Sequence, residues 1–243
     1  MAIVQPAVPE VLDPADIAPN IDHIVTEDDT PVDNIFSEKQ QRLLTEPLYS
    51  SWPGPGPERV FMVAANVGVY AAVYQPPLVP DVFLSLDVHV PEDMWVKNHR
   101  SYFLWEYGKP PDVAIEIVSN RKGHEADSKL RDYARIGVTY YAIFDPDEQL
   151  QGKILRLYAL REGKYAPLKG QWLPEAGLGL TLWHGSFEGT EATWLRWCDH
   201  DGNVIASGAE RAEQERKRAE QERERAERLA ARLRELGVDP EGI

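Results

Sequence analysis

Apolar and polar residues alternate in several short segments in the middle of the chain. Segments about four to eight residues long that are rich in valine, isoleucine and aromatic residues, and that end at proline, glycine, aspartate or serine, are typical of β-strands. The sequence therefore predicts strands over residues 59–64, 67–74, 81–88, 112–119, 139–145, 154–160 and 165–168.

Two segments beside these strands have the spacing of amphipathic helices instead. Residues 37–49 carry three leucines on one face and have Ser37 as a candidate N-cap. Residues 125–136 carry an apolar stripe and end before Gly137, because glycine commonly stops a helix. The order helix, strands, helix, strand predicts a mixed α/β fold built around one sheet.

Both ends of the chain differ from this central part. Residues 1–36 are rich in proline and acid and lack periodicity, which indicates an extended arm. Residues 37–190 would then form the folded domain and residues 191–208 a connector. Residues 209–238 repeat a seven-residue unit, AEQERKR, AEQERER and AERLAAR, and predict a long charged helix with a heptad-like pattern.

The repeat leaves open whether this helix pairs with a second copy. Alanines and Leu233 occupy one seam position, but the other seam position holds Glu215 and Glu222 before Leu229 and Leu236. A stable coiled coil has apolar residues at both seam positions, whereas Glu–Arg pairs three and four residues apart stabilise a lone helix. We therefore favour an exposed helix that pairs weakly, and keep a homodimer as the alternative.

The composition narrows the class of function. The 243 residues have a formal net charge of −14, which argues against a broad basic surface for nucleic acid but suits carboxylates gathered around a divalent cation. No segment is apolar over the length of a membrane span, and the loop SSWPGPGPER lacks the lysine of a phosphate-binding loop. We expect no membrane association and no small-molecule cofactor. A single cysteine, Cys198, and an N-terminus without a signal pattern favour a cytoplasmic location.

The candidate chemistry begins with the segment Asp112–Ser119, DVAIEIVS. It has the composition of a strand buried on both faces, where an unpaired carboxylate such as Glu116 is energetically costly. Because side chains alternate along a strand, Asp81 from another predicted strand can lie on the same side of the sheet as Glu116. Two adjacent carboxylates repel each other unless they share a proton or a cation, and Mg²⁺ or Mn²⁺ can take both as oxygen ligands. Glu116 can equally be a buried acid that pairs with Arg131 or Lys129 for structural reasons.

Several short motifs point to one known family. They are PD at 80–81, EIVS at 116–119, a helix containing Lys129 and Tyr133, and GVTYYAIFDP at 137–146. This combination resembles the Uma-two family of restriction-type endonucleases, which belongs to the PD-(D/E)XK nuclease superfamily. The resemblance implies a restriction-endonuclease-like αβββαβ core with a mixed central sheet, a metal site on the central strands, and DNA as the substrate.

The resemblance also implies roles for particular residues. Asp81, Glu116 and the backbone carbonyl of Ile117 would bind Mg²⁺ or Mn²⁺. The lysine of the superfamily normally lies two residues after the acid, where this chain has Val118, and Lys129 on the following helix is the candidate replacement. The metal and the lysine together would support hydrolysis of phosphodiester bonds.

Two accessory candidates and one competing hypothesis complete the prediction. Glu46 on the first helix and Asp127 on the second are candidate accessory acids. Val118 in the place of lysine favours a protein that has lost turnover and acts as an interaction module through its C-terminal helix. The presence of Asp81, Glu116 and Lys129 together favours an active endonuclease.

Overall fold

A computed structural model of the chain gives the structure described below, which covers residues 20–21, 34–118, 125–150 and 152–236. Its elements follow one another along the chain in an order close to the predicted one. They are α2 (Ile35–Ser50), β1 (Phe61–Ala65), β2 (Val69–Tyr70), β3 (Val82–Leu86), the short 3-10 helix η1 (Lys97–His99), β4 (Tyr102–Phe103), α3 (Leu104–Tyr107), β5 (Val113–Ile117), α4 (Glu125–Ile136), β6 (Tyr140–Phe144), β7 (Leu155–Arg161), β8 (Lys164–Pro167), β9 (Trp172–Leu173), β10 (Leu178–Phe187), β11 (Thr190–Cys198) and α5 (Gly208–Glu235).

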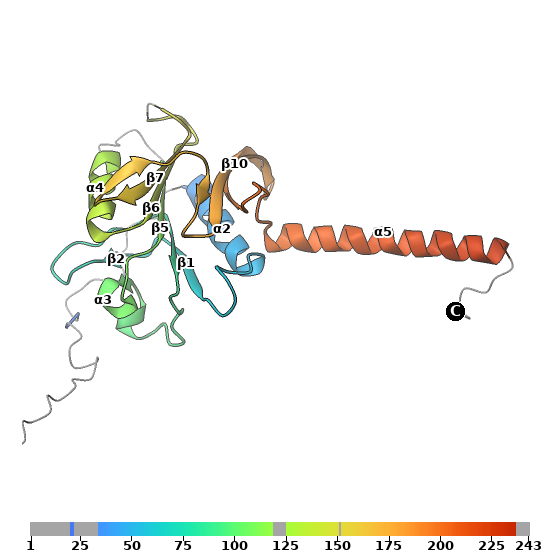
Figure 1. Ribbon diagram of the computed structural model, residues 1–243, viewed down its shortest axis with the longest axis horizontal. Coiled ribbons are helices and arrows are strands. Elements are labelled where there is room, and N and C mark those ends of the chain that lie inside the picture. Colours follow the sequence, from blue (N-terminus) through green and yellow to red (C-terminus); the bar gives the residue numbers. More distant parts are fainter. Residues whose placement is uncertain (1–19, 22–33, 119–124, 151, 237–243) are drawn as a thin grey trace, which may run out of the picture.

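Within the described ranges, a six-stranded sheet with the order β1-β3-β5-β6-β7-β8 forms the centre of the fold. Strands β5 and β6 are parallel and are connected through α4, while the other neighbouring strands are antiparallel. The elements α2, β1, β3, β5, α4 and β6 therefore form the predicted αβββαβ core with a mixed sheet, and the fold class is confirmed. Figure 1 shows α2 and α4 on opposite sides of this sheet.

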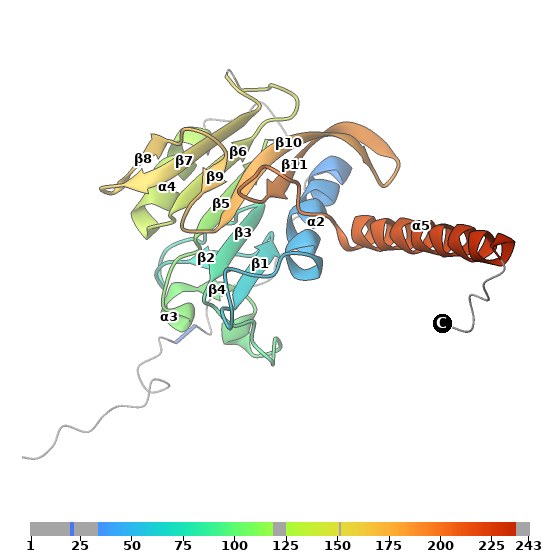
Figure 2. The ribbon, with the colours of Figure 1, turned by 45° about the vertical axis from the view of Figure 1, so that its right-hand side comes forward.

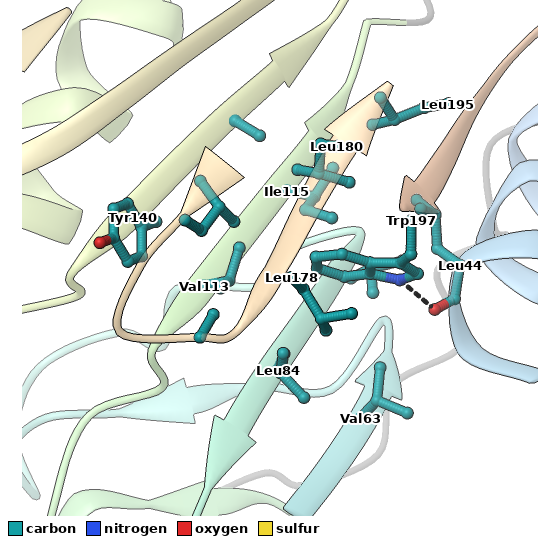
Figure 3. Close-up of a cluster of buried hydrophobic side chains, with 14 of the residues drawn as sticks. Leu44, Val63, Leu84, Val113, Ile115, Tyr140, Leu178, Leu180, Leu195 and Trp197 are labelled. Carbon is teal, nitrogen blue, oxygen red and sulfur yellow. Dashed lines mark hydrogen bonds between the residues drawn. The ribbon is translucent and has the colours of Figure 1, made fainter. Parts of the chain in front are cut away.

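One face of the sheet is covered by α2 and by the small sheet of β9, β10 and β11. Apolar side chains from β3, β5 and β6 meet those of α2 and the small sheet in the largest buried cluster. Figure 3 shows this cluster, in which the indole Nε1 of Trp197 donates a hydrogen bond to the backbone carbonyl of Leu44 over 2.7 Å. Burying aromatic and aliphatic side chains in this layer is the main source of stability for the fold.

A buried glutamine on α2 hydrogen-bonds to the backbone of β11 at the edge of its sheet. The side-chain amide of Gln40, which is fully buried, donates to the carbonyl oxygen of Leu195 over 2.8 Å, and its Oε1 accepts from the amide of the same residue over 2.9 Å. Gln40 thus takes the place of a neighbouring strand, because it satisfies both backbone groups of Leu195 on a side of β11 where the described residues form no further strand of this sheet.

The opposite face of the sheet is covered by α4. Tyr133 on this helix packs against Tyr141 of β6, with ring centroids 5.1 Å apart, and Tyr141 in turn contacts Tyr158 and Tyr165. Helix α4 begins and ends where the sequence predicts, and Gly137 follows it in the left-handed conformation, with φ of +89°. The aromatic layer fixes α4 above the middle strands of the sheet.

The structure corrects three details of the prediction. Helix α2 begins at Ile35, and Asn34 is its N-cap, whose side chain accepts from the amide of Ser37. Only Val69–Tyr70 of the strand predicted over residues 67–74 is a strand. The connector predicted over residues 191–208 contains most of β11, which pairs with β10 along its whole length and belongs to the core.

The base of α5 is fastened to the body of the protein. Ser207 and Glu210 form a capping box, and the guanidinium of Arg196, which is almost fully buried, donates to Glu210 over 2.6 Å. The backbone amide of Gly208 donates to the carboxylate of Glu46 on α2 over 3.0 Å, and Arg211 donates to the carbonyl of Ser50. These contacts fix the direction in which α5 leaves the body.

Beyond its base, α5 extends from the body as a single straight helix (Figures 1 and 2). Its residues are exposed or partly exposed, and ion pairs such as those of Arg216 with Glu213 and of Arg223 with Glu227 join residues of the helix itself. The charged helix predicted from the repeat is therefore present. Among the helices in the described ranges, none is both long and apolar enough to cross a membrane.

Replacing Gln40 with methionine tests its role at the edge of β11. Methionine has a similar shape but cannot hydrogen-bond to Leu195, so a buried amide and a buried carbonyl lose their partner. We expect the free energy of unfolding to fall by about 2 kcal/mol or more, as measured by urea denaturation. The matched control, Gln171→Met at an exposed position, should change it by less than about 0.5 kcal/mol, and equal effects of the two variants would contradict the assignment.

Candidate metal centre

Glu116 lies on β5, on the face of the sheet that α4 covers, and both of its carboxylate oxygens have a partner from that helix. The ammonium of Lys129 lies 2.7 Å from Oε2, and the hydroxyl of Tyr133 donates to Oε1 over 2.7 Å. Lys129 and Tyr133 are four residues apart, so they occupy the same side of α4 one turn from each other. The helix therefore presents one cation and one neutral donor to a single buried acid.

Asp81 lies immediately before β3, next to Glu116. Since Val82 pairs with Ile115 in the antiparallel β3–β5 ladder, one further step along the register places Asp81 opposite Glu116. The Oδ2 atom of Asp81 accepts from the backbone amide of Ile117 over 2.6 Å. Both acids are largely buried, with 9% and 8% of their surfaces exposed. The structure thus brings Asp81, Glu116, Lys129 and the backbone of Ile117 together at one end of β5, as the sequence predicts.

A pair of amide side chains supports Asp81 from the side of α2. Gln41 and Asn66 exchange two hydrogen bonds of 3.2 and 3.0 Å, and the same Nε2 of Gln41 lies 3.4 Å from Oδ1 of Asp81. Asn66 has a positive φ of 54°, and its backbone amide donates to the carbonyl of Asp81. Sequence reasoning did not identify Gln41 or Asn66, because nothing in the local pattern connects these positions with Asp81.

The electrostatics of this centre disfavour two negative charges even with the ammonium of Lys129 beside them. Burial is the largest influence on Glu116 and raises its pKa, Lys129 lowers it, and the nearby charge of Asp81 raises it again. The result is a pKa of about 7 for Glu116 instead of the ordinary 4.5. A divalent cation that contacts both carboxylates would replace proton uptake as the way to reduce this repulsion.

The donor atoms at this centre fit a hard divalent cation. The carboxylate oxygens of Asp81 and Glu116, with the backbone carbonyl of Ile117 at the end of the same strand, are ligands of the type that Mg²⁺ prefers. Within the described part of the chain, no three or more histidine, cysteine, aspartate or glutamate side chains are gathered into a metal-binding group. Mg²⁺ is compatible with so few protein ligands because it keeps several water molecules in proteins.

Of the two predicted accessory acids, the structure places only Glu46, and it lies away from this group. Glu46 lies at the junction of α2 and α5, where its carboxylate accepts from Gly208, so the structure places it at the base of the tail helix instead. Asp127 lies on α4, but its side chain is outside the described residues. Val118, at the position of the usual superfamily lysine, packs with Leu130 in the apolar cluster under α4.

The structure also decides between the alternative partners of Glu116. Lys129 reaches the carboxylate, whereas Arg131 is on an exposed part of the same helix. Tyr133 packs in the apolar cluster under α4 and additionally donates to Glu116. The spacing of four residues between Lys129 and Tyr133 is the signal in the sequence from which this second role can be inferred.

The raised pKa of Glu116 predicts how the stability of the metal-free protein depends on pH. The folded pKa of about 7 lies above the ordinary value of 4.5, so the contribution of Glu116 is fully present below about pH 4.5 and is lost as the pH rises through 7. In EDTA, unfolding free energies measured by urea denaturation should therefore fall between about pH 4.5 and 8 by on the order of 3 kcal/mol more for the wild type than for Glu116→Gln. Parallel pH profiles for the two proteins would show that the Glu116 carboxylate is not perturbed by its surroundings.

Comparison with known proteins assigns the chain to a family. No curated protein matches the sequence. A family model described as "Putative restriction endonuclease", that of the Uma2 family, matches residues 26–183, which include α2, the central sheet, α4 and the group around Glu116. This match spans more than half of the 243 residues. The chain therefore belongs to the Uma2 family of putative restriction endonucleases.

Proposed function

We propose that the protein is a nuclease that depends on a divalent metal ion and hydrolyses phosphodiester bonds in DNA. Membership of the Uma2 family supports a nuclease. The observation that carries the metal-dependent mechanism is that two buried carboxylates, Asp81 and Glu116, lie opposite each other on adjacent chain segments of the sheet. The ammonium of Lys129, 2.7 Å from Glu116, adds from a helix the lysine that the strand lacks at Val118, and the three groups together make an inactive remnant of the fold the weaker hypothesis.

Asp81 and Glu116 would hold Mg²⁺ or Mn²⁺, together with the carbonyl of Ile117. When bound there, the ion lowers the pKa of a water molecule and offsets negative charge on the phosphate. The contacts already made by the two acids keep them in place: the amide of Ile117 orients Asp81, and the hydroxyl of Tyr133 orients Glu116. Such fixed ligands reduce the reorganisation needed to assemble the centre.

Lys129 would act on the substrate. Its ammonium lies beside the carboxylate of Glu116 and about a third of its side chain is exposed, so it is at the border between the buried acids and the surface. From there it can hydrogen-bond to a non-bridging phosphate oxygen or to the attacking water, and it stabilises the negative charge that develops in the transition state. Tyr133 is a positioning residue, because it contacts Glu116 and is itself buried.

Replacing Glu116 with alanine tests the metal centre. Calorimetric titration should detect binding of Mg²⁺ or Mn²⁺ to the wild type at millimolar concentrations or below, and incubation with supercoiled plasmid should give nicked circles. We expect Glu116→Ala to lose both properties, since the centre then retains a single carboxylate. The control Asp112→Ala removes an acid from the other end of β5, where it pairs with Lys109, and should keep both properties. Wild-type protein that binds no metal would overturn the proposal.

Replacing Lys129 with methionine separates turnover from metal binding. The rate of plasmid nicking should fall roughly 100-fold or more, because a charged group that stabilises the transition state is lost, while calorimetry should still detect metal. Arg131→Met removes a cation from the exposed side of the same helix and should nick plasmid at close to the wild-type rate. If the two variants nick equally well, Lys129 has no part in the reaction. If the wild type binds metal but nicks neither DNA nor RNA, the interaction-module hypothesis is preferred.

A further inference from the structure

Arg156 on β7 lies in the same row of the sheet as Glu116. Glu116 pairs with Ile143 across the β5–β6 ladder, and Ile143 pairs with Arg156 across the β6–β7 ladder. Directly paired residues have their side chains on the same face of a sheet, so Arg156 faces the α4 side, as Glu116 does. Because neighbouring strands are about 4.8 Å apart, the two backbone positions are separated by roughly 10 Å.

The guanidinium of Arg156 has donors that the described residues do not use. Its Nε and Nη2 atoms are buried, and no hydrogen-bond acceptor for them is present in the described part of the chain. Buried donors without an acceptor are uncommon in proteins and cost free energy, so each one calls for an explanation. About a fifth of the side chain, 21%, is exposed, so part of Arg156, although not its Nε and Nη2 atoms, reaches the surface on the face of the candidate centre.

Ion pairing with Asp145 does not account for these donors. Asp145 is fully buried at the end of β6, and its two oxygens accept from the backbone amides of Gln149 and Leu150 over 2.9 and 2.7 Å. Nη2 of Arg156 lies 3.8 Å from Asp145, which is too long for a hydrogen bond. The carboxylate is satisfied by its own loop, while the arginine contributes positive charge and keeps its hydrogen-bonding capacity.

We propose that Arg156 binds a backbone phosphate of the DNA strand whose scissile phosphate lies at Glu116. This inference rests on the proposed function and adds a substrate contact to it. The guanidinium nitrogen available to a phosphate oxygen is Nη1, which is not among the buried atoms, and a hydrogen bond between arginine and phosphate is strengthened by the charges of both groups. Phosphates of one strand follow at about 3.4 Å along the helix axis, so a separation of roughly 10 Å places the contact a few nucleotides from the cleaved bond. In a chain with a net charge of −14, a cation at this position directs the acidic substrate to one place on the surface.

The experiment compares two arginines of the same strand. Arg161 also lies on β7, has a carboxylate at 3.8 Å, that of Glu175, and is more exposed than Arg156. Because it is five residues further along the strand, an odd number, its side chain lies on the other face of the sheet. Affinity for a fluorescent DNA duplex is measured by anisotropy at several salt concentrations. Glu116→Gln in EDTA serves as the background, so that no cleavage interferes. Arg156→Met should weaken binding roughly tenfold and lower the salt slope by about one, Arg156→Lys should restore the slope and part of the affinity, and Arg161→Met should do neither.

The possible outcomes separate this inference from the nuclease proposal. If Arg156→Met and Arg161→Met bind the duplex equally well while the wild-type protein nicks plasmid, Arg156 only balances Asp145, and the inference is wrong although the nuclease proposal holds. If the loss is specific to Arg156 and the wild type does not nick, the phosphate contact holds and the nuclease proposal fails. Absence of any measurable affinity for the duplex overturns the inference. If Arg156→Met folds poorly, as judged by its thermal transition, the affinities of Arg156→Lys and Arg161→Lys for the duplex are compared instead. Lysine keeps the charge but lacks the planar guanidinium donors, so only Arg156→Lys should bind the duplex more weakly than the background protein.

Discussion

Two acids, Asp81 immediately before β3 and Glu116 on the adjacent β5, lie opposite each other below the surface, and the neighbouring elements are arranged so that they hold both acids there. Transfer of a carboxylate from water into a protein interior costs several kcal/mol unless partners compensate it. Here the partners come from three elements: Lys129 and Tyr133 from α4, the amide of Ile117 from β5, and Gln41 from α2. The two helices that cover opposite sides of the sheet therefore both contribute to one small centre. A change in the position of either helix would alter the charge balance of that centre.

The order and type of the central elements can be predicted from the sequence because their patterns are local. The strand of Val113–Ile117 has a continuous apolar run around one acid, and α4 has a clear apolar stripe and a glycine stop. The hairpin of β10 and β11 is harder to predict, because its outer half, which includes His184, Gly185 and Ser186, lacks a regular alternation of polar and apolar residues. Its inner half, near Trp197, is buried by α2 from the other end of the chain. The two-residue strand β2 shows the opposite error, because an apolar composition alone does not provide a partner strand over its full length.

The candidate centre was predicted in part, and the division has a physical reason. Asp81, Glu116 and Lys129 stand in recognisable motifs, and the alternation of side chains is enough to place the two acids on one face. The supporting contacts depend on distances between elements that sequence spacing does not determine. Glu46 illustrates this: its helix was predicted correctly, but the face on which it lies meets the base of α5 and not Asp81. Gln41, one turn and a residue earlier on the same helix, is the side chain that reaches the acid.

The fastening of α5 has a consequence for anything that binds at its far end. Arg196, Glu210, Glu46 and Arg211 tie the first turn of α5 to β11 and α2, and α2 also carries Gln41 beside Asp81. The 28 residues of α5 rise by about 1.5 Å each, so the helix is roughly 42 Å long. Its ion pairs between neighbouring turns favour a straight helix over a flexible tether. A molecule bound at the tip of α5 would thus be held at a fixed distance and in a fixed direction from Asp81 and Glu116, with α5 acting as a rigid spacer.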